Sequence, residues 1–356
     1  MFPRNVTRLA ASVPRSGMRT IVSTAIRQSS NAPSIGDINP SPTAIDSFNQ
    51  KQKAFRDELA ASQREREARA LAQDKSSSSA AATGEDTAAN HPDDAGAAAD
   101  RNLSEHDAKS GRLSSLIYGT KEGREMDAQI EASFSQVLAR GKYVHSIVFH
   151  EVKPEKVDEY VKLVGEWYPK MANLEDNKVN LVGSWRTEVG DCDTFIHIWE
   201  YQKYEGYHNS RYNITHHPQF SDFDRKLATL INSKKSSLMQ EFSFWPTTPP
   251  RQLGGIFELR SYTLHPGNLL EWETHWRRGL KARREVMEGV GAWFVQIGDL
   301  NTVHHLWQFA NLEERRARRE SCWSIEGWSD TVHKTVPLIQ DMRSRVLVPM
   351  PWSPVA

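Results

Sequence analysis

The sequence predicts an α+β protein in which two ferredoxin-like (βαββαβ) repeats pack sheet to sheet as a pseudo-dimeric α+β barrel, preceded by a disordered N-terminal region. A strand-like segment occurs twice, as TFIHIWEY at residues 194–201 and TVHHLWQF at residues 302–309. Gly-Asp precedes each copy, and Ser-Asp follows each at the same spacing. An internal repeat of this length indicates a duplicated structural unit. All eleven tryptophans lie between Trp167 and Trp352, so the packed core is expected in the C-terminal part.

Residues 1–30 have the composition of a mitochondrial transit peptide. They contain five arginines and many hydroxyl residues, and the first acidic residue of the chain is Asp37. An amphipathic cationic helix is favoured, and the apolar segment of a secretory signal is missing. We therefore expect import into the mitochondrion, to the matrix or a membrane-associated position.

Residues 31–111 are predicted to form a disordered, charged linker. Residues 46–75 are charged and rich in alanine, with few apolar anchors, which is typical of a solvated or partly helical segment. Residues 76–100 carry no bulky apolar side chain to offset the entropy of ordering. Apolar residues return in 112–142, a predicted docking segment in which Phe134 and Val137 fit the aromatic-x-x-aliphatic pattern of a partner-binding strand.

The first repeat is assigned to residues 143–247. Segments rich in β-branched and aromatic residues favour strands, and apolar spacings of three and four favour helices. Pro154 ends the first strand, and Pro218 breaks the second helical region. The predicted order is strand, helix, two strands joined as a hairpin, helical region and strand, at residues 143–152, 155–171, 181–189, 194–201, 207–234 and 238–244.

The second repeat, residues 254–352, has the same order of elements. Leu269, Trp272, Trp276 and Leu280 form an apolar helical stripe. A hairpin is predicted around Gly298-Asp299. The predicted strands are 256–264, 293–297, 302–309 and 345–350, and residues 313–333 and 335–343 are expected to be helical. Two βαββαβ units whose sheets each carry helices on one face must bury the other face, which predicts the shared barrel.

The core resembles the NIPSNAP family. The motifs that carry the resemblance run in order from His150 to Ile339: HEVKPEKVDEY, LVGSW, IHIWEY, EFSFWP, FELRSYTLHPG, VQIGDLNTVHHLWQF and TVPLI. The resemblance implies a mitochondrial protein built from two dimeric α/β-barrel-type units. It also implies roles in vesicle-related transport or in mitophagy, with autophagy adaptors or mitochondrial membrane-associated proteins as partners.

The repeated strand places a histidine and a tryptophan on one side in each copy. Alternation puts His197 and Trp199 on one face of the first copy, and His305 and Trp307 on the matching face of the second. If these two pairs line a shared cavity, they are candidates for a haem or aromatic-ligand pocket. The alternative is that each histidine is a satisfied core residue beside a core tryptophan.

The first strands of the two repeats differ in charge. Glu258, Arg260 and Tyr262 share one side of residues 256–264, where the first repeat has uncharged residues. If this side faces the interior, one half has kept a ligand site centred on these three residues and His305. The alternative is an ion pair that braces the structure. Two basic stretches, residues 281–284 and 315–319, are interpreted as solvated helix faces.

Composition and motifs limit the other functions. Lysine and arginine balance aspartate and glutamate at 45 each, so no nucleic-acid partner is indicated. Two cysteines predict neither a disulfide framework nor a metal site. The usual nucleotide-binding, zinc-protease and serine-hydrolase motifs do not occur, and no cofactor, metal or catalytic residue is assigned. No transmembrane segment is expected.

We expect a non-enzymatic binding or adaptor protein in mitochondrial quality control or vesicle-related transport. The alternative is a small-ligand or haem-binding protein, or a cofactor-independent oxidative enzyme, that uses the barrel interior. A structural subunit of a larger assembly is a third possibility, and homo-oligomerisation is left open.

Overall fold

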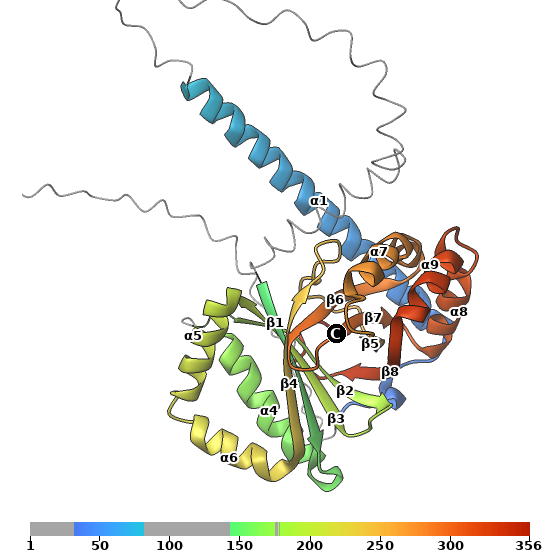
Figure 1. Cartoon of the computed structure of the whole chain (residues 1–356). Coiled ribbons are helices and arrows are strands. Elements are labelled where there is room, and N and C mark those ends of the chain that lie inside the picture. The colour runs from blue at the N-terminus through green and yellow to red at the C-terminus, as the bar shows by residue number, and fades with distance from the viewer. Residues whose placement is uncertain (1–31, 82–142, 175–176, 178) are drawn as a thin grey trace, which may run out of the picture. The chain divides into compact units, whose positions relative to one another are not determined.

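The computed structural model describes residues 32–81, 143–174, 177 and 179–356, and residues 143–356 contain a closed eight-stranded barrel (Figure 1). Neighbouring strands follow the order β1-β3-β2-β8-β5-β7-β6-β4, and all pairings between them are antiparallel. The strands are β1 (Tyr143–Val152), β2 (Val179–Val189), β3 (Thr194–Gln202), β4 (Ile231–Glu241), β5 (Ile256–Leu264), β6 (Glu288–Ile297), β7 (Thr302–Phe309) and β8 (Ile339–Pro349).

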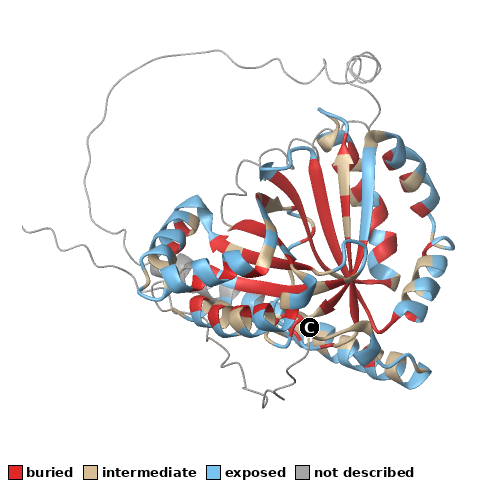
Figure 2. Ribbon diagram, turned by 90° about the horizontal axis from the view of Figure 1, so that it is seen from below, coloured by how far each residue is buried: buried red, intermediate tan, exposed pale blue. Residues whose placement is uncertain are grey.

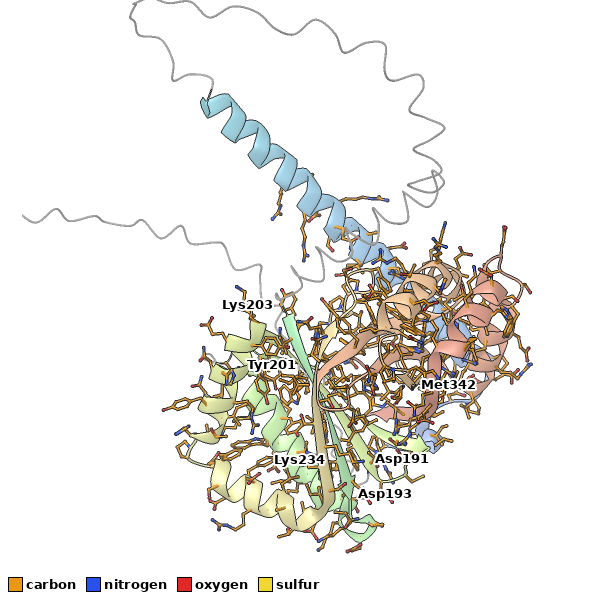
Figure 3. The ribbon with its side chains drawn as sticks, in the orientation of Figure 1. Asp191, Asp193, Tyr201, Lys203, Lys234 and Met342 are labelled. Atoms are coloured by element: carbon orange, nitrogen blue, oxygen red, sulfur yellow. The ribbon has the colours of Figure 1, made fainter. Side chains whose placement is uncertain are left out.

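The strand order confirms the two predicted ferredoxin-like repeats. Each repeat contributes four adjacent strands, β4-β1-β3-β2 from the first and β8-β5-β7-β6 from the second. The two sheets join along two seams, where β2 pairs with β8 and β4 pairs with β6. At the first seam Arg345 of β8 binds Asp191 in the β2–β3 turn at 2.6 Å, and Figure 3 marks this turn at the same end of the barrel as Lys234. The pseudo-dimer is therefore one continuous barrel.

The helices lie on the outer face of the strands of their own repeat (Figure 1). In α4 the buried residues Val157, Tyr160, Val164, Trp167 and Met171 recur at spacings of three and four, which is the apolar stripe of an amphipathic helix. The helices are α4 (Val157–Ala172), α5 (Lys203–Thr215) and α6 (Phe220–Leu230) in the first repeat, and α7 (Leu269–Val286), α8 (Leu312–Cys322) and α9 (Trp328–Thr335) in the second. Short 3-10 turns occur at Ile35–Asp37, Pro154–Lys156 and Val336–Leu338.

Large apolar side chains fill the barrel interior. One buried cluster takes members from all eight strands, including Trp185 of β2, Met239 of β4, Phe257 of β5 and Trp293 of β6. Figure 2 shows the strands coloured mostly as buried. Because residues on a strand alternate between its two faces, a cluster that joins every strand can only be the inner face. The barrel interior is thus a packed core.

Four strands begin earlier than the sequence pattern predicts. β2 and β6 begin at Val179 and Glu288, ahead of the predicted residues 181 and 293, whereas β4 and β8 begin inside predicted helices. β4 begins at Ile231, within a segment predicted to be helical to residue 234, and β8 begins at Ile339, where residues 335–343 were expected to be helical. The first halves of both strands are polar and largely exposed, so they lack the apolar alternation by which a strand is recognised. Pairing with β1 and β5 determines their structure instead, and the helical predictions were wrong.

The described part of the linker is a long helix, α1 (Pro42–Ala81), which continues past residue 76. Its first half is not fully solvated, because Phe48 is buried against Leu253 and Ala310. Arg56 also binds Glu288 of β6 at 2.6 Å. The transit peptide, the rest of the linker and the docking segment with Phe134 and Val137 lie outside the described residues. Among the helices that are described, none is long and apolar enough to cross a membrane.

Candidate functional site

The two histidine–tryptophan pairs lie on the outer face of the barrel. Their neighbours Ile196, Ile198 and Leu306 belong to the interior cluster, so alternation directs the pairs toward the helices. Trp199 packs with Tyr168 of α4, while Trp307 packs with Trp245, and His305 with Trp276 of α7. The predicted alternation of the strand is confirmed. The two pairs lie on the side away from the interior, so they do not share one cavity.

His197 belongs to a buried hydrogen-bond chain. The hydroxyl of Tyr160 bridges two imidazoles, at 2.7 Å from Nδ1 of His150 and 2.8 Å from Nε2 of His197. Nδ1 of His197 is 2.9 Å from the hydroxyl of Ser184. Burial lowers the pKa of His197 well below its usual range, and that of His150 to about 3. Both rings are therefore neutral at physiological pH, and every nitrogen of His197 is satisfied, as in the alternative interpretation of a core histidine.

His305 has a different environment. Its Nδ1 accepts a hydrogen bond from Nε1 of Trp307 at 2.7 Å, and its ring meets that of Tyr262 edge to face at 4.8 Å. Its Nε2 is buried without a hydrogen-bond partner among the described residues. Burial, followed by the charges of Arg260 and Arg283, lowers the pKa of His305 well below its usual range. His305 is therefore neutral, and it lies among aromatic rings beside guanidinium groups.

Glu258, Arg260 and Tyr262 meet as the sequence predicted, but beneath α8 on the outer face and not in the interior. Nη1 of Arg260 binds Oε1 of Glu258 at 2.8 Å, and its Nε donates to the Tyr262 hydroxyl at 2.7 Å. Arg315 of α8 donates hydrogen bonds to both carboxylate oxygens of Glu258, at 2.8 and 2.9 Å, and the hydroxyl of Ser344 in β8 donates to Oε1 at 2.7 Å. Burial would raise the pKa of Glu258, yet the hydrogen bonds from Arg315 and the charge of Arg260 hold it well below its usual range. The carboxylate is ionised and fully enclosed.

Two more arginines complete this guanidinium cluster, which we define as Arg260, Arg283, Arg315 and Arg319 around Glu258. Nη1 of Arg319 is 3.9 Å from Glu258, and Arg283 is 8% exposed with its guanidinium 4.2 Å from the Trp328 ring. Burial and then Arg319 lower the pKa of Arg283 to about 10. The basic stretches that supply Arg283, Arg315 and Arg319 were interpreted as solvated helix faces, so three of the four arginines were not predicted to belong to a site.

A second polar group lies inside the barrel, at the end where β1 begins. His145, Glu200 and Glu241 place their ligand atoms within 4.8 Å of one another. Nε2 of His145 is 3.3 Å from Glu200 and 3.1 Å from the Thr247 hydroxyl, which donates to Glu241 at 2.8 Å. Nε1 of Trp293 binds the same hydroxyl at 3.0 Å. Two carboxylates and an imidazole are suited to holding a divalent cation or moving a proton.

This interior polar group was missed because it depends on strand register. His145 faces Glu200 across the β1–β3 pair, and the matching pair in the second repeat is Phe257 and Gln308. Glu241 comes from the end of a third strand. The available signal was two polar residues at inward positions of neighbouring strands, which requires knowing the inner side. The cluster around Glu258 therefore belongs to the second repeat alone, and the group of His145, Glu200 and Glu241 comes from strands of the first repeat.

Both repeats of this chain match a known protein family. The NIPSNAP family model matches residues 146–246 and 257–354, so both repeats are covered. The chain belongs to the NIPSNAP family. Protein NipSnap homolog 1 of Danio rerio is 40% identical over 69% of this chain and 87% of its own length. Protein NipSnap homolog 2 of Homo sapiens is 37% identical over 65% of this chain and 82% of its own.

A solved structure from Burkholderia xenovorans, an uncharacterized NIPSNAP-like domain protein, is 36% identical to this chain. It covers 27% of this chain and 84% of its own length, with a TM-score of 0.26. The family model matches the two halves of the barrel separately, so the NIPSNAP repeat that the sequence suggested is present twice in this protein.

Proposed function

We propose that this NIPSNAP protein is imported into mitochondria and acts there by binding other proteins, in mitochondrial quality control or vesicle-related transport. One observation carries the proposal: the barrel interior, where enzymes of related architecture would hold a ligand, is occupied by the protein's own side chains. Trp185, Phe257 and Trp293 are completely buried there with eleven other apolar residues of one cluster. Tight packing of this kind makes a stable scaffold and leaves the surface and the N-terminal segments for recognition.

Import is tested with residues 1–30 fused to a fluorescent reporter. We expect mitochondrial fluorescence, and its loss when the five arginines of this segment are replaced by glutamine, because a presequence depends on its positive charge. Replacing the serines of the segment by alanine is the matched control and should leave import intact. If the wild-type reporter and the arginine-to-glutamine reporter are both distributed evenly through the cell, the mitochondrial proposal is rejected.

Partner binding is tested in cells that express the full chain and whose mitochondria have been damaged. The double substitution Phe134→Ala/Val137→Ala should reduce recruitment of autophagy adaptors at least severalfold, because both apolar anchors of the predicted strand-forming motif are removed. Ser135→Ala, between them, is the control. Recruitment should also survive Glu200→Gln in the barrel. An unchanged response to the double substitution together with loss in Glu200→Gln would reverse the proposal in favour of an activity in the interior.

A second function, small-ligand binding or oxidative catalysis in the barrel, is favoured by the polar group of His145, Glu200 and Glu241. Two partly buried carboxylates lie beside one imidazole, and their other hydrogen bonds come from neutral groups, the Asn180 side chain and the hydroxyl and backbone N–H of Thr247. Such a pair is stabilised by a bound cation or a shared proton.

Native mass spectrometry with an absorption spectrum of the purified full chain tests this second function. A co-purifying metal or small ligand that is lost in Glu241→Gln would support it. If neither the wild type nor the variant carries mass beyond its own polypeptide, and neither shows ligand absorption, this second function is rejected.

A further inference from the structure

We propose that the guanidinium cluster of the second repeat, Arg260, Arg283, Arg315 and Arg319 around Glu258, is a binding site for a phosphate dianion. The site does not depend on the proposed role in quality control, because it is defined by contacts within the second repeat. Its ligand chemistry is that of a phosphate monoester group, whether on a soluble molecule or on a lipid headgroup.

The positive charges of the cluster outnumber its carboxylates. The guanidinium groups of Arg260, Arg315 and Arg319 lie 2.8–3.9 Å from Glu258, and the charge of Arg319 also acts on Arg283. Four arginines and one carboxylate leave three positive charges without a negative partner in this cluster. All four have restricted solvent access, with side-chain exposure of 14, 25 and 30% for Arg260, Arg315 and Arg319, and Arg283 is buried. Holding like charges together away from water is unfavourable. A bound dianion would offset most of this excess.

Two of these arginines have buried donors without an acceptor among the described residues. Arg283 makes no ion pair in the described part of the chain, and its Nε is buried without a hydrogen-bond partner. Nη1 of Arg319 is also buried without a hydrogen-bond partner, since its contact with Glu258 is 3.9 Å long. Buried donors are normally satisfied, so these two point to an acceptor that binds between them.

Neighbouring side chains hold the guanidinium cluster in place from several sides. Glu258 fixes Arg315 through two hydrogen bonds and Arg260 through one, and Tyr262 fixes Nε of Arg260. The guanidinium group of Arg283 stacks on the Trp328 ring, 4.2 Å from the ring centroid. Glu258 therefore acts as an organiser of the arginines, and its single charge cannot neutralise them. Preformed guanidinium forks of this kind suit phosphate oxygens.

The two repeats differ at the positions of this cluster. At the positions of the first repeat that match Glu258 and Arg260 in strand register stand Ser146 and Val148. The first repeat solves the same packing problem between strand and helix with uncharged groups, so the fold itself does not require the arginines. Their presence in one half alone is better explained by a ligand than by stability.

The test measures thermal unfolding and calorimetric binding of the full chain with inorganic phosphate at constant ionic strength. The wild type should gain thermal stability with phosphate concentration, as expected when a ligand binds only the folded state. Arg319→Gln should weaken phosphate binding at least about tenfold, the equivalent of one charge-assisted hydrogen bond. Without phosphate, Arg319→Gln should unfold at the same temperature as the wild type or higher, since it relieves repulsion. A merely structural arginine would give the opposite shift.

Arg316→Gln is the matched control, because Arg316 lies on the same helix but pairs with Glu313 and Glu320 at the surface. It should retain wild-type phosphate affinity. Arg319→Lys, which keeps the charge without the planar fork, should bind phosphate with intermediate affinity. The proposal is overturned if phosphate does not stabilise the wild type and no vesicle binding is seen, or if Arg319→Gln retains wild-type affinity, or if both glutamine variants lose the same amount.

Vesicles of phosphatidylcholine with and without phosphatidic acid distinguish the two sources of phosphate. Binding of inorganic phosphate without vesicle binding identifies a soluble ligand. Binding to phosphatidic acid vesicles that is reduced by Arg319→Gln and not by Arg316→Gln identifies a lipid headgroup. Either outcome supports the phosphate site.

Discussion

Replacing Gly291 by alanine tests how tightly the barrel interior is packed. An added Cβ at Gly291 would lie 2.4 Å from a ring atom of Trp293, well inside the ordinary contact distance. Trp293 is completely buried, so the ring can yield only by displacing its neighbours. Overpacking of this kind costs ~1–3 kcal/mol, and moving the ring also weakens the hydrogen bond from its Nε1 to Thr247, worth ~1 kcal/mol. We expect the free energy of unfolding to fall by about 2–4 kcal/mol.

Urea unfolding followed by tryptophan fluorescence and circular dichroism measures this change. Gly36→Ala is the matched control, because its added Cβ would meet only the flexible Ser34 hydroxyl, at 3.3 Å. In a double-mutant cycle, Trp293→Phe removes the outer ring atoms that cause the clash. Gly291→Ala should then cost clearly less in the Trp293→Phe background than in the wild type. A loss below ~0.5 kcal/mol in the wild-type background, or equal losses in both backgrounds, would refute the reasoning, since surface-like changes fall in that range.

Three further predictions concern polar groups. Tyr160→Phe should lower the free energy of unfolding by ~2–4 kcal/mol in urea titrations, because it unpairs two buried imidazole nitrogens at once; no loss would mean that water replaces the hydroxyl. The pKa of Glu258 is lower in the folded state than its ordinary 4.5, so the stability it provides is complete above that pH and is lost as the pH falls below it. Glu258→Gln should therefore flatten the acid side of the stability profile measured from pH 6 to pH 3, and an unchanged slope would contradict the assignment. Glu288→Gln should destabilise by ~3–5 kcal/mol because it leaves buried Arg251 without its carboxylate partner, whereas Arg56→Ala, on exposed α1, should cost ~1 kcal/mol or less; similar losses in thermal melts would argue against this ranking.

Much of the fold was predictable because most elements have a strong local pattern. The repeated hairpins and the apolar stripes of α4 and α7 define the two repeats, and the requirement to bury a second sheet face predicts the barrel. The beginnings of β4 and β8 were not predictable in the same way, since those residues are polar on both faces and become strands only through their partners.

The site was predictable in part. Glu258, Arg260 and Tyr262 share a strand face, so alternation alone brings them together. Arg283, Arg315 and Arg319 join them only because α7 and α8 pack over β5, a long-range arrangement that spacing along the chain does not contain. His145 and Glu200 similarly depend on register and on which face is inside. The same ambiguity of side left two interpretations open for His197 and His305, a shared pocket and separate core histidines.

The two seams of the barrel have a consequence for how such a protein can vary. A single repeat would expose the edges of β2 and β4 and would need a second copy to close the sheet, so its stability would depend on protein concentration. In a barrel formed by two identical chains, any substitution appears twice around the axis. Covalent fusion of the repeats makes closure independent of concentration and lets each half change alone. A cluster of four arginines can then be placed in one half, and a pair of carboxylates with a histidine in the other, without either being imposed on both.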